Sequence, residues 1–201
     1  MTRMTRRMIV LVALAAGAAA LQPSFPVLAQ APGAWKTAFD GKTLSGWDKT
    51  GDANWEVVDG VMQASKGAGF LVTPTPYTDF QITLEFWVTP DANSGVFIRC
   101  ADPKMPSTMT GYEVNIFDMR PDQTYRTGAI VNVAKPLNMT VNTGNKWNSF
   151  DITARGSKFT VVLNGEKMVD NAENADHPSG HIALQYGAGT VKFRNIRIRT
   201  F

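Results

Sequence analysis

The stretch Phe80-Gln81-Ile82-Thr83-Leu84-Glu85-Phe86-Trp87-Val88 alternates apolar and polar side chains along its whole length. Successive side chains of a β-strand point to opposite faces, so this pattern predicts a strand with one buried face. A shift of the register by one residue would exchange the two faces, which makes the register well specified. The stretch therefore predicts a strand in a half-buried sheet.

Similar alternating stretches follow one another through the rest of the chain. Asp59-Gly60 and Asn164-Gly165 each separate two such runs, and both dipeptides favour type I′ hairpin turns because they tolerate positive φ. The predicted strands are 55–58, 61–64, 69–73, 80–88, 95–100, 112–117, 128–133, 147–154, 158–163, 166–169, 181–186 and 191–199. Many short strands without helices predict an all-β, antiparallel β-sandwich of the jelly-roll type.

The N-terminus has the three parts of a secretory signal peptide. These parts are a basic segment with Arg3, Arg6 and Arg7, the apolar run 8–21, and the small-residue site Ala29-Gln30-Ala31. The apolar run is too short to cross a hydrocarbon core of about 30 Å as a helix. We therefore predict a leader over residues 1–31, a single domain over 32–201, and export to the periplasm or the outside of the cell.

Loss of this leader changes the charge of the chain. Three of the 20 Lys and Arg residues lie in the leader, so its removal leaves 17 basic residues against 17 acidic ones. A neutral protein lacks the clustered positive charge that nucleic acids require, and we expect no membrane span after cleavage. Cys100 is the single cysteine, so no disulfide can form within the chain. It lies in an apolar strand, which predicts a small buried hydrophobic residue.

The outward faces of four predicted strands carry acids, amides and aromatic rings. The outward residues are Glu85, Trp87, Phe97, Arg99, Glu113, Asn115, His181 and Gln185. Carboxylates and amides bind sugar hydroxyls, and aromatic rings stack on the apolar face of a sugar, so this set suits a carbohydrate site. An ion pair between Glu85 and Arg99, with the aromatic rings covering a sheet edge, explains the same pattern. The pattern alone leaves both interpretations open.

Short motifs in the same order as in one known family run through the chain. They are Phe39-Asp40-Gly41-Lys42-Thr43-Leu44-Ser45-Gly46-Trp47, Asn93-Ser94-Gly95-Val96, Gly111-Tyr112-Glu113-Val114, Thr127-Gly128-Ala129, Trp147-Asn148, Gly180-His181-Ile182-Ala183-Leu184-Gln185 and Phe193-Arg194-Asn195-Ile196. In these motifs the chain resembles the DUF1080 family, described as 3-keto-disaccharide hydrolase or 3-keto-glucoside 1,2-lyase and 3-keto-2-hydroxyglucal hydratase. The resemblance covers residues 35–201 and implies a fold similar to concanavalin-type lectins and glucanases. The chain departs from the family at Tyr186-Gly187, where members often carry Asp-His, at Trp87 (often Arg or Lys) and at Asn115 (often Gln).

The resemblance implies chemistry on a glycoside that is already oxidised at C3. The ketone acidifies the C2 proton, so a base can remove it and the C1–O bond then breaks by elimination. We assign Glu113 as this base, with His181 as the second choice for base or leaving-group acid. Arg99, with Asn93 or Gln185, is expected to polarise the ketone. The other expected substrate contacts are Glu85, Trp87, Phe97, Asn115 and Asp118.

Two other functional classes stay open beside a 3-keto-glycoside lyase or hydrolase. They are a carbohydrate-binding module without turnover and a partner-binding β-sandwich. Two histidines and one cysteine cannot supply a typical zinc site, and no cofactor is predicted. Asp118 and Asp122 leave an oxygen-ligand calcium site open. The chain also lacks a nucleophile-elbow, phosphate-loop or dinucleotide motif.

Overall fold

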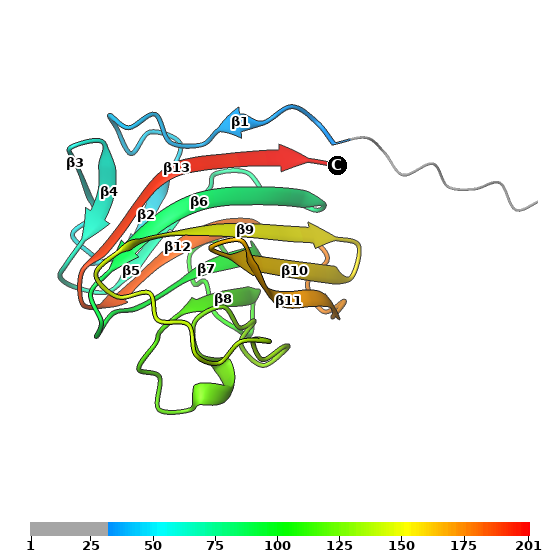
Figure 1. Ribbon diagram of the computed structural model, residues 1–201. Helices are drawn as coiled ribbons and strands as arrows, with labels where there is room; N and C mark the ends of the chain where they lie inside the picture. Colours follow the sequence, from blue (N-terminus) through cyan, green and yellow to red (C-terminus); the bar gives the residue numbers. More distant parts are fainter. Residues whose placement is uncertain (1–31) are drawn as a thin grey trace, which may run out of the picture. The chain divides into compact units, whose positions relative to one another are not determined.

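A computed structural model describes residues 32–201, so the predicted signal peptide lies outside the described part of the chain. Two antiparallel sheets pack face to face (Figure 1). Sheet A has the order β11-β10-β9-β6-β13-β4-β3, with β1 added to β13, and sheet B has the order β2-β5-β12-β7-β8. This arrangement confirms the predicted antiparallel β-sandwich.

The bounds of the strands follow the alternating stretches of the sequence closely. Sheet A contains β1 Lys36–Thr37, β3 Glu56–Val58, β4 Val61–Ala64, β6 Phe80–Val88, β9 Trp147–Arg155, β10 Lys158–Leu163, β11 Glu166–Glu173 and β13 Val191–Thr200. Sheet B contains β2 Asp48–Gly51, β5 Gly69–Val72, β7 Asn93–Cys100, β8 Tyr112–Ile116 and β12 His181–Ala188. One 3₁₀ turn, Gln123–Tyr125, lies in the segment after β8.

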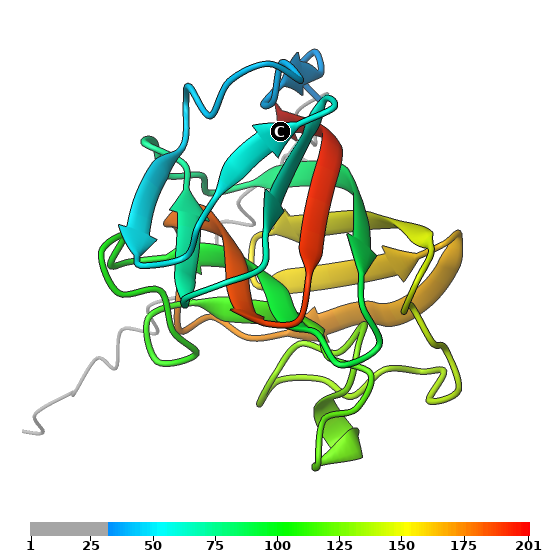
Figure 2. The same cartoon turned by 90° about the vertical axis from the view of Figure 1, so that its left-hand side faces the viewer.

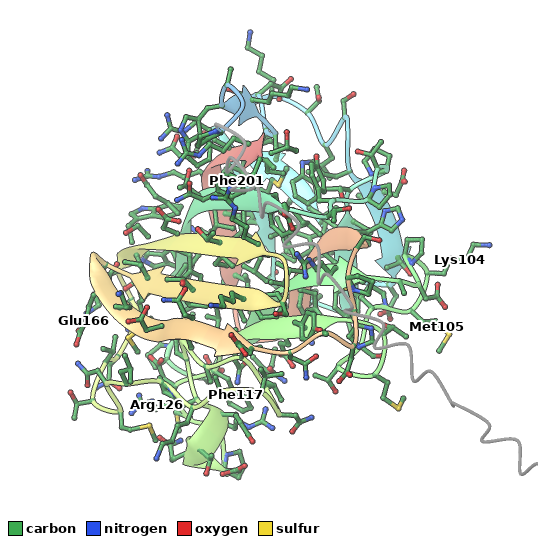
Figure 3. The ribbon with its side chains drawn as sticks, turned by 90° about the vertical axis from the view of Figure 1, so that its right-hand side faces the viewer. Lys104, Met105, Phe117, Arg126, Glu166 and Phe201 are labelled. Atoms are coloured by element: carbon green, nitrogen blue, oxygen red, sulfur yellow. The ribbon has the colours of Figure 1, made fainter. Side chains whose placement is uncertain are left out.

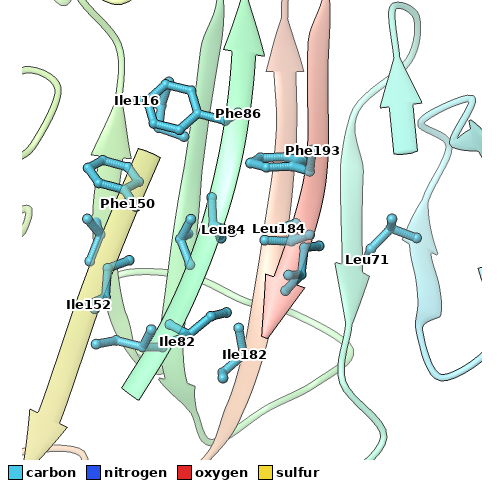
Figure 4. Packing of buried hydrophobic residues seen from close by; sticks show 14 of the residues in the cluster. Leu71, Ile82, Leu84, Phe86, Ile116, Phe150, Ile152, Ile182, Leu184 and Phe193 are labelled. Carbon is cyan, nitrogen blue, oxygen red and sulfur yellow. The ribbon is translucent and has the colours of Figure 1, made fainter. Parts of the chain in front are cut away.

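The core lies between the two sheets (Figure 4). In β6 every second side chain, from Phe80 to Val88, is at most 2% exposed. Leu84 and Phe150 from sheet A share this core with Ile116 and Leu184 from sheet B. The inward residues predicted from the alternation in β6 are thus confirmed.

Both predicted hairpins close through type I′ turns. Asp59 and Gly60 have φ values of 51° and 79°, and Asn164 and Gly165 have 52° and 81°. Positive φ at two successive positions is the defining feature of this turn. The turn chemistry of the sequence therefore fixes the β3–β4 and β10–β11 registers.

The predicted strand 128–133 is wrong as a continuous strand. Its first residues do pair with the edge of β8, since Asn115 N–H donates to the Ala129 carbonyl at 3.0 Å and Val131 N–H to the Glu113 carbonyl at 3.0 Å. The chain then reverses at Asn132, which has a φ of 62°. This short pairing satisfies backbone groups that would otherwise form an open sheet edge.

A β-bulge in β7 breaks the alternation at Arg99. In the pairing with β12, His181 lies opposite Cys100 and Ala183 opposite Phe97, so β7 holds one extra residue. Arg99 lies in this bulge and has a left-handed backbone conformation, with a φ of 53°. A bulge re-aims the side chains that follow it. Arg99 therefore turns inward instead of outward, and Cys100 joins the outer face of sheet B.

Arg99 is 1% exposed, and its guanidinium group donates hydrogen bonds to other parts of the chain. Its Nε donates to the Thr78 carbonyl at 2.8 Å, its Nη1 to the Gly156 carbonyl at 2.7 Å, and its Nη2 to Asp79 at 3.2 Å. The predicted place of Arg99 beside the substrate is thus wrong, and so is its alternative pairing with Glu85. Arg99 instead ties β7 to the chain segments at one end of the sandwich.

We predict that Arg99→Met lowers the free energy of unfolding by about 3 kcal/mol, because it leaves the Thr78 and Gly156 carbonyls without their donor and each unsatisfied buried acceptor costs about 1–3 kcal/mol. Arg199→Met, which removes a guanidinium bound to Gln81 on the outer face of sheet A, should cost about 1 kcal/mol or less. Chemical denaturation of the two variants measures both values. Equal stability of Arg99→Met and the parent chain would contradict the structural role.

Candidate functional site

The outer face of sheet B brings most of the predicted site residues together. Strand pairing places them in two rows across all five strands. One row is Asp48, Val72, Ala183, Phe97 and Glu113, and the next is Thr50, Phe70, Gln185, Gly95 and Asn115. The face therefore combines the carboxyl group of Glu113 on the edge strand β8, two amides and an aromatic pair, with the exposed Asp48 on the opposite edge strand β2.

Glu113 is a buried acid although it points away from the core. It is 8% exposed, and burial raises the pKa of its carboxyl group from 4.5 to about 7, while the positive charge of Arg120 acts in the opposite direction. Desolvation favours the neutral form of a carboxyl group. Glu113 therefore titrates near neutral pH, as a general base or acid must.

Gly95 makes room for this carboxyl group. A Cβ atom at Gly95 would lie 3.1 Å from both Cγ and Oε1 of Glu113. The Glu113 side chain thus leans over Gly95, toward the row that holds Asn115 and Gln185. This glycine is part of the Asn-Ser-Gly motif found in the sequence.

Asn115 and Gln185 present amide oxygens that are buried and have no hydrogen-bond partner in the described residues. The Asn115 Nδ2 group donates to the Tyr125 carbonyl, which orients the amide. Gly95 lies between the two residues in the strand order β12-β7-β8. Buried acceptors without partners are costly, so a ligand that donates hydrogen bonds would be favoured here.

An aromatic pair forms the neighbouring part of the face. Phe70 and Phe97 meet edge to face with their ring centroids 5.3 Å apart. Phe97 is only 3% exposed although it points outward, as predicted. Cys100 lies in the same outer cluster, where burial raises the pKa of its thiol to about 12, so it is the inert buried residue expected from the sequence.

Two chain segments flank this face. The segment 101–111 after β7 reaches the opposite edge strand, where Thr50 Oγ1 donates to the Lys104 carbonyl at 3.0 Å (Figure 2). The segment 117–146 after β8 supplies Arg120 and the carbonyl group that holds Asn115. Met105 and Arg126, one from each segment, project at well-separated places (Figure 3). The first segment is thus tied to β2 and the second to β8.

Asp118 fixes the second of these segments. Its carboxylate accepts hydrogen bonds from Thr127 Oγ1 at 2.5 Å and from Thr143 N–H at 2.6 Å. Asp122 instead caps the 3₁₀ turn by accepting from the Thr124 N–H at 3.0 Å. Within residues 32–201 no group of three or more His, Cys, Asp or Glu side chains could hold a metal ion.

Asn93 lies on the same face, one row beyond Gly95. Its pairing partner on β12 is Ala188, and a Cβ atom at Gly187 would lie 3.2 Å from the Asn93 Nδ2 atom. The Asn93 amide therefore occupies the space above Gly187. This is where the family often carries a histidine.

His181 lies at the end of the outer face, opposite Cys100 and two strands away from β8. Its Nδ1–H donates to the Thr73 carbonyl at 2.7 Å, which leaves Nε2 as an acceptor. Neighbouring strands are about 4.8 Å apart, so the structure does not bring His181 within hydrogen-bond reach of Glu113. A direct partnership between these two residues is not supported.

Glu85 and Trp87 do not belong to this face. Both project from β6 on the outer face of sheet A, at the other side of the sandwich. Glu85 accepts a hydrogen bond from Arg194 Nε at 2.6 Å, and Lys192 Nζ lies 5.0 Å from the centroid of the Trp87 ring. Their predicted place beside Glu113 is wrong, because the alternation tells inward from outward but not which sheet a strand joins.

Arg120 is the residue that the sequence analysis missed. It lies in an irregular segment, so no alternation marks it. It is half-buried, its Nε has no hydrogen-bond partner in the described residues, and its charge acts on Glu113. Arg120 thus provides the positive charge near the carboxyl group that Arg99 was expected to provide.

Solved structures with this fold include several carbohydrate-related proteins. Two crystal structures from Parabacteroides distasonis, each named "putative glycosyl hydrolase", align with TM-scores of 0.72 and 0.69. They are 22% and 26% identical and cover 83% and 84% of this chain, and 94% and 100% of their own. The carbohydrate-binding module CBM66 from Bacillus subtilis is 17% identical over 75% of this chain and 93% of its own, with a TM-score of 0.54.

No curated protein matches the sequence. Over residues 32–201 no helix is both long and apolar enough to span a membrane. A family profile, in contrast, matches residues 34–199, which is nearly the whole described chain. With the β-sandwich and its outward carboxyl group, this match shows that the chain belongs to the family of 3-keto-alpha-glucoside-1,2-lyase-like domains.

Proposed function

We propose that this protein cleaves 3-keto-glucosides by 1,2-elimination on the outer face of sheet B, with Glu113 as the base. The observation that carries the proposal is a buried carboxyl group whose pKa is raised to about 7, on which the charge of Arg120 acts, and which shares its sheet face with two unpartnered amide oxygens. The family match supports the substrate class. At neutral pH about half of the Glu113 side chains would be ready to accept a proton.

The proposed reaction has two stages. Glu113 removes the proton from C2, and the electron pair moves into the enolate of the C3 ketone, whose negative oxygen the Arg120 guanidinium would stabilise. The enolate then forms a C1=C2 double bond as the C1–O bond breaks. The aglycone leaves as an alcohol after it takes up a proton, from protonated Glu113 or from water. The product is the 3-keto-2-hydroxyglucal.

The other parts of the face would hold the sugar. The Asn115 and Gln185 oxygens can accept from sugar hydroxyls, and the Asn93 amide can donate to a sugar oxygen. The Phe70–Phe97 pair offers an apolar wall beside the ring.

A carbohydrate-binding role without turnover is the second candidate. It is favoured by Tyr186-Gly187, which leaves no second acid or histidine in the row beyond Gln185. In this case Glu113 would only accept a hydrogen bond from a sugar hydroxyl.

The deciding measurement is incubation of the mature chain with 3-keto-glucosides and their unoxidised parents. Aglycone release and the ultraviolet absorbance of the enone, from the keto sugars only, are the expected results. Glu113→Gln should lower kcat about 10²- to 10⁴-fold, the usual share of a general base. Saturable binding without release by the parent chain would favour the binding module.

The rate should depend on pH through Glu113. Since the base acts in its charged form, kcat should rise with pH around a midpoint near 7. Arg120→Gln should move this midpoint to higher pH, because the loss of the positive charge raises the pKa of Glu113. Arg120→Lys should keep the midpoint near that of the parent chain. An unchanged midpoint in Arg120→Gln would show that the charge of Arg120 does not act on Glu113.

The burial of Glu113 has a consequence for stability that does not depend on turnover. Its pKa is raised on folding, so the folded state binds this proton more tightly and loses stability as pH rises from 4.5 through about 7. At about 1.4 kcal/mol per pKa unit, the loss is about 3 kcal/mol. Glu113→Gln should remove this part of the pH dependence in denaturation measured at pH 5 and pH 8. An identical pH dependence in both chains would contradict the raised pKa.

A further inference from the structure

The outer face of sheet A contains two cavities that the proposed reaction does not use. One has a volume of about 340 Å³ and the other about 390 Å³. Both are lined by Glu85, Asn195 and Arg197, so they meet on one part of the face. Asp151 and Ser149 from β9 and Thr83 from β6 line the first cavity as well.

The two carboxylates of this region are held in place by neighbouring side chains. Glu85 accepts from Arg194 Nε at 2.6 Å and from Asn195 Nδ2 at 2.9 Å. Asp151 accepts from Gln81 Nε2, at 2.6 Å and 2.8 Å to its two oxygens. A carboxylate oxygen can accept more than one hydrogen bond, so both groups can still bind the hydroxyls of a ligand.

Arg197 differs from its neighbours on β13. The Arg194 side chain binds Glu85 and that of Arg199 binds Gln81, whereas the Arg197 side chain forms no hydrogen bond or ion pair with any described residue. Its guanidinium carbon lies 5.4 Å from the centroid of the Trp35 ring. Its guanidinium donors are therefore free at the boundary of the two cavities.

Thr83 adds a hydroxyl group that could bind a ligand. It lies opposite Arg197 in the pairing of β6 with β13, and its Oγ1 atom is buried without a hydrogen-bond partner among the described residues. On its other side Thr83 pairs with Asp151 of β9. The Asp151 carboxylate, the Thr83 hydroxyl and the Arg197 guanidinium group thus come from paired positions on three neighbouring strands.

Arg197 is the group in this region that would attract an anionic ligand. The charged residues that line the two cavities are Arg197, Glu85 and Asp151, and the charge of Glu85 is balanced by its ion pair with Arg194. A carboxylate would match the planar fork of Arg197. The fixed acceptors Asp151 and Glu85 would at the same time accept from hydroxyl groups.

We propose that this face is a second, non-catalytic site that binds acidic sugars of the hexuronate class. The sugar carboxylate would bind Arg197, and its hydroxyls would bind Asp151, Ser149 and Thr83. A uronate is the ligand class that combines an anion for Arg197 with several donors for the carboxylates. The site lies on the opposite face of the sandwich from Glu113, so it does not depend on the proposed elimination.

Titration of the mature chain with methyl glucuronide and, as a matched neutral probe, methyl glucoside tests this proposal. Amide chemical shifts in the ¹H–¹⁵N spectrum report the site. The expected result is saturable shifts at Ser149, Asp151 and Gly165 with the glucuronide and binding at least tenfold weaker with the glucoside. Glucoside binding of equal strength, shifts confined to Gly95 and Phe97, or no saturable shift would each overturn the proposal.

Arg197→Gln should weaken glucuronide binding at least tenfold, whereas Lys167→Gln, which removes the same charge from exposed β11, should not change it. Thr83→Val keeps the side-chain shape and should weaken binding severalfold. Turnover of 3-keto-glucosides, where present, should be equal in Arg197→Gln and the parent chain. A loss of turnover together with binding would show a single site and would overturn the assignment of a second one.

Discussion

The burial of one face of each sheet against the other is the constraint on which the rest of the structure depends. Each large side chain in this layer contributes about 1.5–3 kcal/mol, so the register of β6 or β8 cannot slip without losing several such contributions. Val114 and Ile116 are fully or almost fully buried in the core. Glu113 and Asn115 must therefore point outward on the same strand. The chemistry of the outer face follows from packing on the inner one.

The two outer faces differ in how far their outward acidic residues are buried. Phe97 and Glu113 point away from the core, yet both are less than 9% exposed. Phe97 packs against Phe70, and the segment after β8 covers the β8 edge by the pairing of Ala129 and Val131. On sheet A, in contrast, Glu85 is about one-third exposed and already paired with Arg194. Burial raises the pKa of Glu113 to about 7, whereas for Glu85 the effect of desolvation is outweighed by hydrogen bonds from Asn195 and Arg194, which lower its pKa.

The period of two predicts the inward side chains of β6, and the turn dipeptides predict where two hairpins close. It could not predict that β6 and β8 belong to different sheets, because strand order depends on contacts between distant parts of the chain. For this reason Glu85 and Trp87 were grouped with Glu113. Nor could it locate the bulge at Arg99, since one extra residue leaves the local pattern of apolar residues nearly intact. The role of Arg120 comes from loop geometry alone, for which alternation gives no signal.

The composition of the sheet B face fits an elimination better than ordinary glycoside hydrolysis. Hydrolysis of an unactivated glycoside uses two carboxyl groups on either side of the bond. Here the row after that of Glu113 holds the amides of Asn115 and Gln185, and a glycine stands at 187. A ketone at C3 removes the need for a second acid, because it stabilises the carbanion that a single base creates. One buried carboxyl group beside one arginine is thus a sufficient set of charges for the proposed reaction, and a second carboxylate would weaken it by repelling the enolate.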